Sequence, residues 1–394
     1  MAETVTPTTN RVGDITEGKV LLTKKPVIAC IAAGQGGYNA MRAMWDKPFC
    51  SPENSFYLNY QTDLLSAKLL DPEHRININE NAYGAGKSRD KAKSDATQTV
   101  SVWSQELASK IDPKTDKIYV LCSAGGGFGS GAGPLISAVV SQDKFLNRKG
   151  RRLPVEVIMF KPALSANREE WYNYSECLKE MTALVNAKAI SLYIADLSSS
   201  NIENPDERNL AVDTEVAELL YRFECLNFIS NVSNLDFEDR YVLSSTPKMR
   251  GLLRFNETDG SWSSPFIMPK GVLVNRLGYE VPEGSENIVE AIARSFGVTV
   301  LDKSFKGIYP TGAASSGAYP IMLFSGFNVP ESLLAESNDV VTELNRKAEA
   351  VEKADREKSK GAFDMLSENK AAIEESNSTV DTGSIENIMN LING

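Results

Sequence analysis

Glycine is concentrated at residues 125–133, where the sequence GGGFGSGAG holds six of the chain's 27 glycines. A backbone rich in glycine turns sharply and lets a ligand approach closely. An apolar segment, residues 117–123, precedes this run, and a helical pattern opens near Gly133. A helix placed there offers unpaired N–H groups and the positive end of its dipole to an anion. We therefore expect the loop to bind phosphate oxygens. A flexible linker is the alternative, but linkers rarely lie between a buried strand and an apolar helix.

A second glycine-rich loop, Gly34–Gly37, follows the first apolar segment of the chain. It nearly matches the dinucleotide-binding pattern GxGxxG, with Asn39 in the place of the last glycine. A tight turn between a strand and a helix would use the same residues. Because the 125–133 loop follows another strand of the same expected sheet, we favour a nucleotide whose phosphates reach between the two loops.

A third loop, residues 84–88, reads GAGKS and resembles the end of a P-loop, although Asn81 stands where the first glycine would be. We expect its backbone N–H groups to touch a terminal phosphate, with Lys87 nearby as a mobile charge. A surface turn is the alternative interpretation.

Three carboxylates fall within four residues in the segment Asn234–Asp239, NLDFED. Such a group can hold a cation or polarise a water molecule for attack on a phosphate; it can equally be a solvated helix end. A predicted helix of about 25 residues, on the order of 37 Å long, separates it from the glycine-rich loops. One molecule therefore cannot easily bring these acids to its own nucleotide, whereas a second molecule stacked head to tail can.

Short apolar segments alternate with helical patterns over the first half of the chain. This alternation predicts an α/β fold with a parallel sheet, helices on both faces and ligands at the carboxyl ends of the strands. The predicted strands are residues 27–32, 55–60, 117–123, 155–160 and 189–195, and the predicted helices are 37–46, 94–110, 133–142 and 168–187.

The second half differs in pattern. A long apolar helix is predicted from residue 206 to about 230, and then a smaller α+β block with strands at 271–275, 298–301 and 319–324 and a helix at 286–296. We divide the chain into an N-terminal arm (1–25), a nucleotide-binding domain (26–205), a central helix (206–232), a smaller α+β domain (233–330), a C-terminal helix (331–360) and a disordered tail (361–394).

Composition narrows the function. The 394 residues carry a formal net charge of −10, which argues against direct binding to nucleic acid or an anionic membrane. Five cysteines without a CxxC pair and a single histidine make a disulfide framework, a zinc site or Ser–His–Asp chemistry improbable. No apolar run approaches a membrane span, and the first residues lack the pattern of a signal peptide. We expect an acidic, cytoplasmic protein.

In combination, these segments resemble the tubulin/FtsZ superfamily of filament-forming GTPases. AAGQGGYNAM resembles the family's first nucleotide loop, GGGFGSGAG its GGGTGSG motif, and NLDFED its NxDFAD loop. Weaker matches are NYQTD at 59–63 with the second loop, GAG at 84–86 with the third, and MLFSGF at 322–327 with a strand of the second domain. The resemblance covers about residues 26–330 in the family's order.

The resemblance implies GTP or GDP with Mg²⁺ as cofactors. The domain at 26–205 then binds GTP, and the domain at 233–330 is GTPase-activating. In the family, subunits stack so that the acidic loop of one completes the GTP site of the next, and hydrolysis depends on assembly.

The resemblance also assigns roles to residues. The phosphate side would be formed by Gly34, Gln35, Gly36, Gly37, Asp63, Gly84, Ala85, Gly86, Gly125, Gly126, Gly127, Phe128, Gly129, Ser130 and Gly131. The base and sugar would be contacted by Asn39, Arg168, Asp196 and Asp213, with Thr214 as the neighbouring alternative to Asp213. Asn234, Asp236 and Asp239 would act on the attacking water of the neighbouring subunit's GTP. No protein metal ligand is assigned.

Several positions depart from the family pattern. Phe128 replaces a threonine whose hydroxyl faces the phosphates, Ala166 stands where a ribose-binding glutamate is expected, and Asp196 replaces an asparagine that contacts guanine. The tail, STVDTGSIENIMNLING, lacks the aromatic or proline-bearing peptide of cell-division FtsZ. Because of these departures and the charged C-terminal helix, the sequence most resembles the plasmid- and phage-encoded TubZ/PhuZ branch of the family.

We therefore expect a GTP-dependent filament protein that positions plasmid or phage DNA. The net charge favours contact with DNA through an adaptor protein at the C-terminal region, where residues 385, 388, 389 and 392 form a short amphipathic pattern. The alternatives are a cell-division ring protein, a homologue that binds nucleotide without turnover, and a Rossmann oxidoreductase using Gly34–Asn39.

Overall fold

The computed structural model describes residues 26–47, 50–80, 83–142, 145–146, 150–225, 233, 235–256, 261–309 and 319–377; for 256, 302 and 360–377 it describes the backbone only. The described residues up to Asn338 pack as one unit, and those from Asp339 belong to a second. The predicted N-terminal arm, the end of the central helix at 226–232, Asn234 and the tail from 378 lie outside the described residues.

A parallel sheet forms the centre of the first unit. Its main strands are β1 (Ile28–Ala33), β2 (Ser55–Asn59), β4 (Lys117–Ser123), β5 (Val155–Lys161) and β6 (Ser191–Asp196), in the order β6-β5-β4-β1-β2 with β3 (Arg75–Asn77) at the edge. Nearly every residue of the five main strands is buried, as expected for a sheet covered on both faces. In register, Ala33 pairs with Leu58 on one side and Cys122 on the other, so these strands end level with one another.

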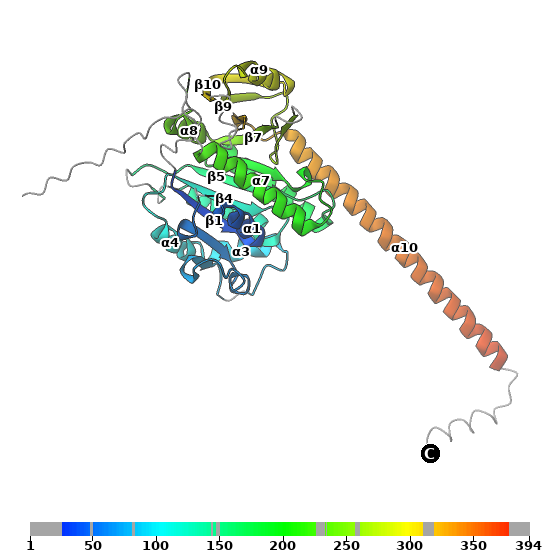
Figure 1. Ribbon diagram of the computed structural model, residues 1–394. Helices are drawn as coiled ribbons and strands as arrows, with labels where there is room; N and C mark the ends of the chain where they lie inside the picture. The colour runs from blue at the N-terminus through cyan, green and yellow to red at the C-terminus, as the bar shows by residue number, and fades with distance from the viewer. Residues whose placement is uncertain are drawn as a thin grey trace, which may run out of the picture. The chain divides into compact units, whose positions relative to one another are not determined.

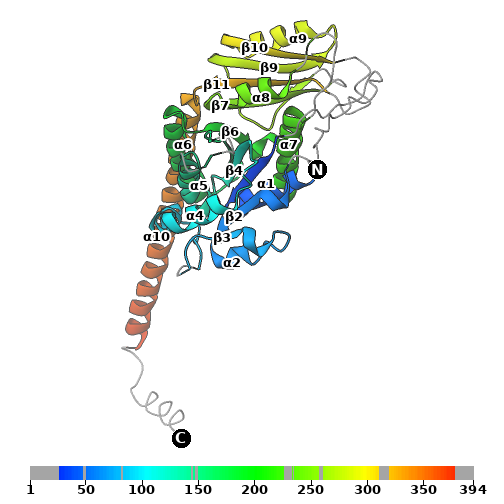
Figure 2. The same ribbon diagram turned by 90° about the vertical axis from the view of Figure 1, so that its left-hand side faces the viewer.

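Helices cover both faces of the sheet (Figures 1 and 2). α1 (Gly34–Trp45) and α7 (Pro205–Cys225) lie against one face and share its core. α3 (Arg89–Gln98), α5 (Gly127–Val140) and α6 (Arg168–Asn186) cover the other, α5 packing against both α3 and α6. α2 (Gln61–Leu64) and α4 (Val100–Lys110) complete the helices of this part.

The smaller block continues the same sheet. β7 (Lys248–Asn256) pairs in parallel with β6 at only two positions, Ser191 with Lys248 and Leu192 with Met249. Beyond it lie β11 (Ile321–Phe327), β9 (Leu273–Pro282) and β10 (Thr299–Tyr309), with antiparallel β7-β11-β9 and parallel β9-β10 pairing. The short β8 (Ser261–Ser263), α8 (Phe237–Ser244) and α9 (Glu286–Ser295) complete this mixed part. The expected α/β fold with a smaller α+β block is confirmed.

Several expected boundaries were wrong. α5 begins at Gly127 rather than near Gly133, because glycine in the first turn supplies close packing instead of an open loop. α10 (Glu331–Asn377) continues well past the expected helix end at residue 360. Strand β7 was missed, since its Met, Arg and Gly residues obscure the strand pattern.

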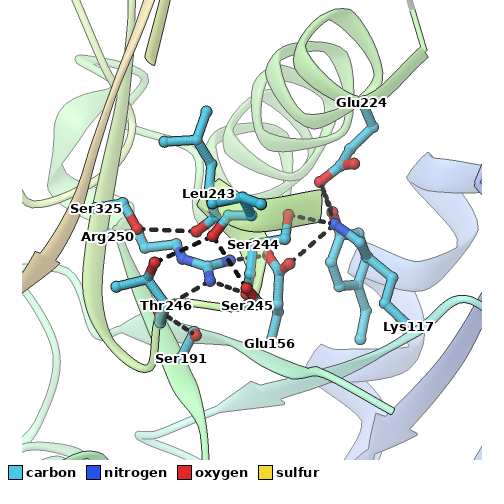
Figure 3. Close-up of polar contacts among 12 residues, drawn as sticks. Lys117, Glu156, Ser191, Glu224, Leu243, Ser244, Ser245, Thr246, Arg250 and Ser325 are labelled. Carbon is cyan, nitrogen blue, oxygen red and sulfur yellow. Dashed lines mark hydrogen bonds and ion pairs between the residues drawn. The ribbon is translucent and has the colours of Figure 1, made fainter. Parts of the chain in front are cut away.

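A buried ionic cluster joins the two parts of the sheet (Figure 3). The Lys117 ammonium, on the first residue of β4, contacts Glu156 Oε1 at 3.0 Å, Glu224 Oε1 at 2.7 Å and Ser244 Oγ at 2.6 Å. Arg250 on β7 forms an ion pair with the second oxygen of Glu156 at 2.8 Å. The cluster thus holds the ends of α7 and α8 at the amino-terminal edge of the sheet, where β4 begins.

Candidate functional site

The glycine-rich run at 125–133 forms the amino-terminal end of α5. Gly126 is the N-cap residue, and the first backbone hydrogen bond of the turn runs from Ser130 N to Gly126 O. The N–H groups of the first turn have no partner inside a helix and point outwards along its axis. The Ser130 hydroxyl also donates to Gly126 O and Gly127 O, so both donors of Ser130 are used within the helix rather than facing a ligand.

The first loop meets this helix end directly. Gly34 has a φ of +78°, and a Cβ at this position would lie 3.1 Å from the backbone nitrogen of Gly129 and 3.4 Å from the Phe128 side chain. Only a residue without a side chain adopts this conformation without strain. The carboxyl ends of β1 and β4 therefore bring the two predicted phosphate loops into contact.

The third loop also closes on the same point. A Cβ on Gly127 would lie 2.4 Å from the carbonyl carbon of Lys87, so the two backbones touch. Asn173 of α6 holds them together: its amide nitrogen donates to Lys87 O and to Gly125 O, each at 3.1 Å. Asn173 was not among the residues expected from the sequence; its signal is an amide among the mostly apolar buried residues of α6.

A cleft of about 480 Å³ lies between α1 and α7, and Asn39 and Asp213 both line it. Asp213 is 6% exposed, and burial raises the pKa of its carboxyl group to about 7. Thr214 also lines the cleft. Asn209, one turn before Asp213, lines it too, and its side-chain oxygen has no hydrogen-bond partner among the described residues. Asn209 was not expected from the sequence, although its i, i+4 spacing from Asp213 places both on one helix face.

A chain of polar side chains crosses the ends of β1 and β2. Gln35 donates to Asn39 Oδ1 at 3.0 Å and accepts from the Tyr57 hydroxyl at 3.1 Å, to which Asn59 Nδ2 donates at 2.7 Å. Burial raises the pKa of the Asp63 carboxyl group, partly countered by hydrogen bonding from Asn59. Gln35 thus orients Asn39 at the ends of these two strands.

Phe128 is buried in the first turn of α5. Its ring meets that of Tyr60 edge to face at a centroid distance of 5.5 Å, and the Tyr60 hydroxyl donates to Asp95 Oδ2 at 2.7 Å. The ring therefore fills the space between Gly34 and Tyr60. No hydroxyl is present where the family resemblance expects one.

Other predicted residues have different surroundings. Asp196 pairs with the Lys161 ammonium at 3.2 Å and accepts from Ser198 N at 2.9 Å. It lines a separate cavity of about 590 Å³ beside Trp262 and the start of α10, so the structure does not bring it to the α1–α7 cleft. Arg168 is the first residue of α6; it is exposed and does not line that cleft.

The remaining predicted glycines divide into two kinds. Gly84 and Gly86 have positive φ angles with open space around them, and Ala85 lies between them, half-buried. Gly36, Gly37, Gly129 and Gly131 each lie too close to a neighbouring strand or helix to carry a side chain. The second group is therefore explained by packing alone.

The acidic segment lies at the start of α8. Asp236 is its N-cap, with Oδ1 accepting from Asp239 N at 2.9 Å. Burial, followed by the charge of Asp236, raises the pKa of the Asp239 carboxyl group. α8 follows α7, whose 21 residues span roughly 32 Å. The Lys117 cluster holds the ends of both helices at the amino-terminal edge of the sheet. Asp236 and Asp239 are therefore remote from the glycine-rich loops, which lie at the opposite edge.

The loops at the carboxyl edge fit a nucleoside triphosphate. A helix end with free N–H groups suits phosphates, and a desolvated carboxylate beside an asparagine in a cleft suits a base with several N–H donors. The described residues hold no group of three metal-ligating side chains. Since Mg²⁺ is commonly held by one or two carboxylates together with phosphate oxygens, Asp63 fits as a single protein contribution. In the described part of the chain, no helix has the length and apolar character needed to cross a membrane.

Comparison with known proteins identified no matching family model and no curated relative. Among solved structures, the chain is similar to TubZ of Clostridium botulinum phage c-st, at 20% identity and a TM-score of 0.64, covering 81% of this chain and 98% of that one. It is similar to a GTPγS-form protofilament of Bacillus thuringiensis TubZ at 16% identity and a TM-score of 0.63, covering 83% and 94%. CetZ from Methanosaeta thermophila matches at 17% identity and a TM-score of 0.56, covering 91% and 100%. The chain therefore has the tubulin/FtsZ fold, in a form like that of TubZ.

Proposed function

Starting from this tubulin/FtsZ fold, we propose that the chain is a GTPase that assembles head to tail and hydrolyses GTP between subunits. The observation that carries the proposal is the separation of two half-sites. Phosphate-binding loops lie at the carboxyl edge of the sheet, and the acids of α8 lie past the far end of α7. Two molecules stacked in one direction join these halves.

The guanine base occupies the α1–α7 cleft. Asp213 accepts hydrogen bonds from guanine N1–H and the 2-amino group, and Asn39, oriented by Gln35, contacts the base beside it. The loops at Gly34, Gly84–Gly86 and Gly125–Phe128 donate backbone N–H groups to the phosphates.

The acids of α8 act on the GTP of the neighbouring subunit. Asp239 accepts a proton from the attacking water, and Asp236 orients that water while capping the helix. Asn234 is the third residue expected at this point. Asp63 is the protein carboxylate that would help to hold Mg²⁺, and the ion would supply charge that neutralises the triphosphate.

Several similar structures are named as filaments, which supports head-to-tail assembly. They include a GTPγS-form and a GDP-form TubZ protofilament and a two-stranded TubZ filament. A Rossmann oxidoreductase would leave both the α5 terminus and the acidic segment without a role. The test is light scattering with GTP, GDP and ATP, alongside phosphate release. We expect GTP alone to give both scattering and turnover; ATP acting equally well, or turnover without assembly, contradicts the proposal.

The cellular role proposed is the positioning of plasmid or phage DNA in the cytoplasm. One similar structure is named a type III plasmid segregation TubZ, and another is phage-encoded. With a net charge of −10, the chain contacts DNA through an adaptor that binds its C-terminal region. Fluorescence anisotropy with labelled duplex DNA tests this: the protein alone should not bind at about 0.15 M salt, and direct binding would contradict an adaptor.

A further inference from the structure

Lys87 occupies an unusual backbone position beside the phosphate-binding helix end. It has a φ of +63°, the left-handed region that few residues other than glycine adopt. Its carbonyl is held by Asn173 and its backbone touches Gly127, the first residue of α5. The contacts on both sides fix a conformation that lysine does not favour, and non-glycine residues held in this way cluster at ligand sites.

The residues that follow keep this position in place. Ser88 caps α3 by accepting from Lys91 N, and Arg89 is buried with a 2.8 Å ion pair to Glu180. The Arg89 carbonyl lies against Gly131, where a Cβ would approach to 2.1 Å. The loop and the first residue of α3 therefore meet α5 at two successive turns, which leaves little freedom at Lys87.

The ammonium group of Lys87 is loosely held. Its contact with Glu170 Oε1 is 3.8 Å long, and the Lys87 side chain is 60% exposed. The other two cations between residues 87 and 91 have short ion pairs, Arg89 with Glu180 and Lys91 with Asp95 at 2.5 Å. An exposed pair as long as that of Lys87 and Glu170 contributes little, so an incoming anion can take over the ammonium group.

Glu170 is fixed beside the same loop. Its second carboxylate oxygen accepts from Asn167 N at 3.2 Å in the capping box of α6, and its Cβ lies 3.3 Å from the place of a Cβ on Gly125. The carboxylate that retains Lys87 is thus adjacent to the glycine-rich turn, close to where phosphate would bind.

We propose that Lys87 is the cationic contact to the terminal phosphate of the bound nucleoside triphosphate, released from Glu170 when the triphosphate binds. This rests on the proposed function of the site. A triphosphate carries one more phosphate than a diphosphate, and the ammonium group is the mobile charge at the loop that closes over the end of α5. Lys87 therefore distinguishes GTP from GDP. It makes a phosphate contact at a site where Phe128 provides no hydroxyl group.

The test compares binding of GTPγS and GDP to the full chain by isothermal titration calorimetry. Lys87→Gln should lower the affinity for GTPγS about tenfold or more, as expected for loss of a charged hydrogen bond, and change GDP affinity less than about twofold. Lys87→Arg should retain most of the preference. Glu170→Gln, which preserves the cap, should change GTPγS affinity by less than about twofold, because the 3.8 Å pair that it removes contributes little.

Lys91→Gln is the matched control, since it removes the same charge one turn further on. If it lowers GTPγS affinity as much as Lys87→Gln does, the effect is general electrostatics and the proposal fails. Equal loss of GTPγS and GDP in Lys87→Gln, with an unchanged melting temperature, also overturns it. Failure of the wild-type chain to bind either nucleotide would instead refute the proposed function itself.

Discussion

The Lys117 ammonium group lies 2.7 Å from Glu224 Oε1, joining the first residue of β4 to the end of α7. Burial disfavours the charged form, but Glu156 and Glu224 outweigh it and raise the pKa of the lysine. The same ammonium group reaches Ser244 at the end of α8. Through this one residue, the sheet that carries the glycine-rich loops holds the helix that begins at Asp236 and Asp239.

Removal of Lys117 should destabilise the fold. Lys117→Met leaves two buried carboxylates without their shared cation, for which we expect a loss of about 3–5 kcal/mol in the free energy of unfolding. The measurement is urea unfolding followed by circular dichroism. Lys114→Met, which removes a nearby exposed lysine, should change stability by less than about 0.5 kcal/mol. Similar losses in both variants would show that the cluster has no special role.

Asp213 should determine the choice of base. Asp213→Asn replaces two acceptors with one acceptor and one donor, which suits the 2-carbonyl of xanthine better than the 2-amino group of guanine. We expect GTP affinity to fall by about 10- to 100-fold and XTP affinity to rise. Competition binding with GTP, XTP and ATP measures this. An Asn variant that still prefers GTP would remove Asp213 from the base contact.

The raised pKa of Asp213 gives binding a pH dependence. The folded chain holds this proton up to about pH 7, whereas the unfolded chain releases it near the ordinary value of 3.8. Asp213 therefore contributes stability to the fold that is fully present below pH 3.8 and is lost as the pH rises through about 7. Guanine requires the carboxylate, so GDP affinity should increase from about pH 6 to about pH 8 in the wild type more steeply than in Asp213→Asn. Parallel pH profiles would contradict this.

The role of Phe128 can be tested with two smaller residues that differ in a hydroxyl group. Both Phe128→Ala and Phe128→Thr remove a buried ring that packs on Tyr60, at a cost of about 3–5 kcal/mol for the alanine. Only threonine restores a hydroxyl to the first turn of α5. GTP turnover should therefore be faster in the Thr variant than in the Ala variant. Equal rates at a temperature where both are folded would show that the hydroxyl has no part in this site.

Asp236 has two roles that substitution can separate. Asparagine is as good an N-cap as aspartate, so Asp236→Asn should keep stability while lowering turnover by about 10²–10⁴-fold. Asp236→Ala should lose the cap as well, at about 1 kcal/mol. Assembly with GTP should persist in the Asn variant, giving long-lived filaments visible by electron microscopy. Normal phosphate release from Asp236→Asn would exclude its charge from catalysis.

Patterns local in sequence predicted the fold, and they named several residues of the candidate site. The buried strands β1, β4 and β5 were read correctly because continuous apolar segments bounded by turns have few other interpretations. Asn39 and Asp213 were also anticipated, and the structure brings both to one cleft.

The remainder depends on contacts between distant segments. Asn173 acts by bridging Lys87 and Gly125, and Asp196 is held away from the cleft by Lys161, which no local pattern shows. Gly131 is explained by the Arg89 carbonyl packed against it rather than by phosphate binding. Glycine signals close approach in the sequence, but only the fold shows whether a ligand or another segment approaches.

The most direct test of the shared site is GTP turnover per subunit, measured as phosphate release over a wide range of protein concentration. If the acids of one molecule complete the site of the next, the rate per subunit should be near zero in dilute protein and rise steeply once scattering shows assembly. A rate per subunit that is constant from dilute to concentrated protein would contradict the account, because each molecule would then contain a complete site.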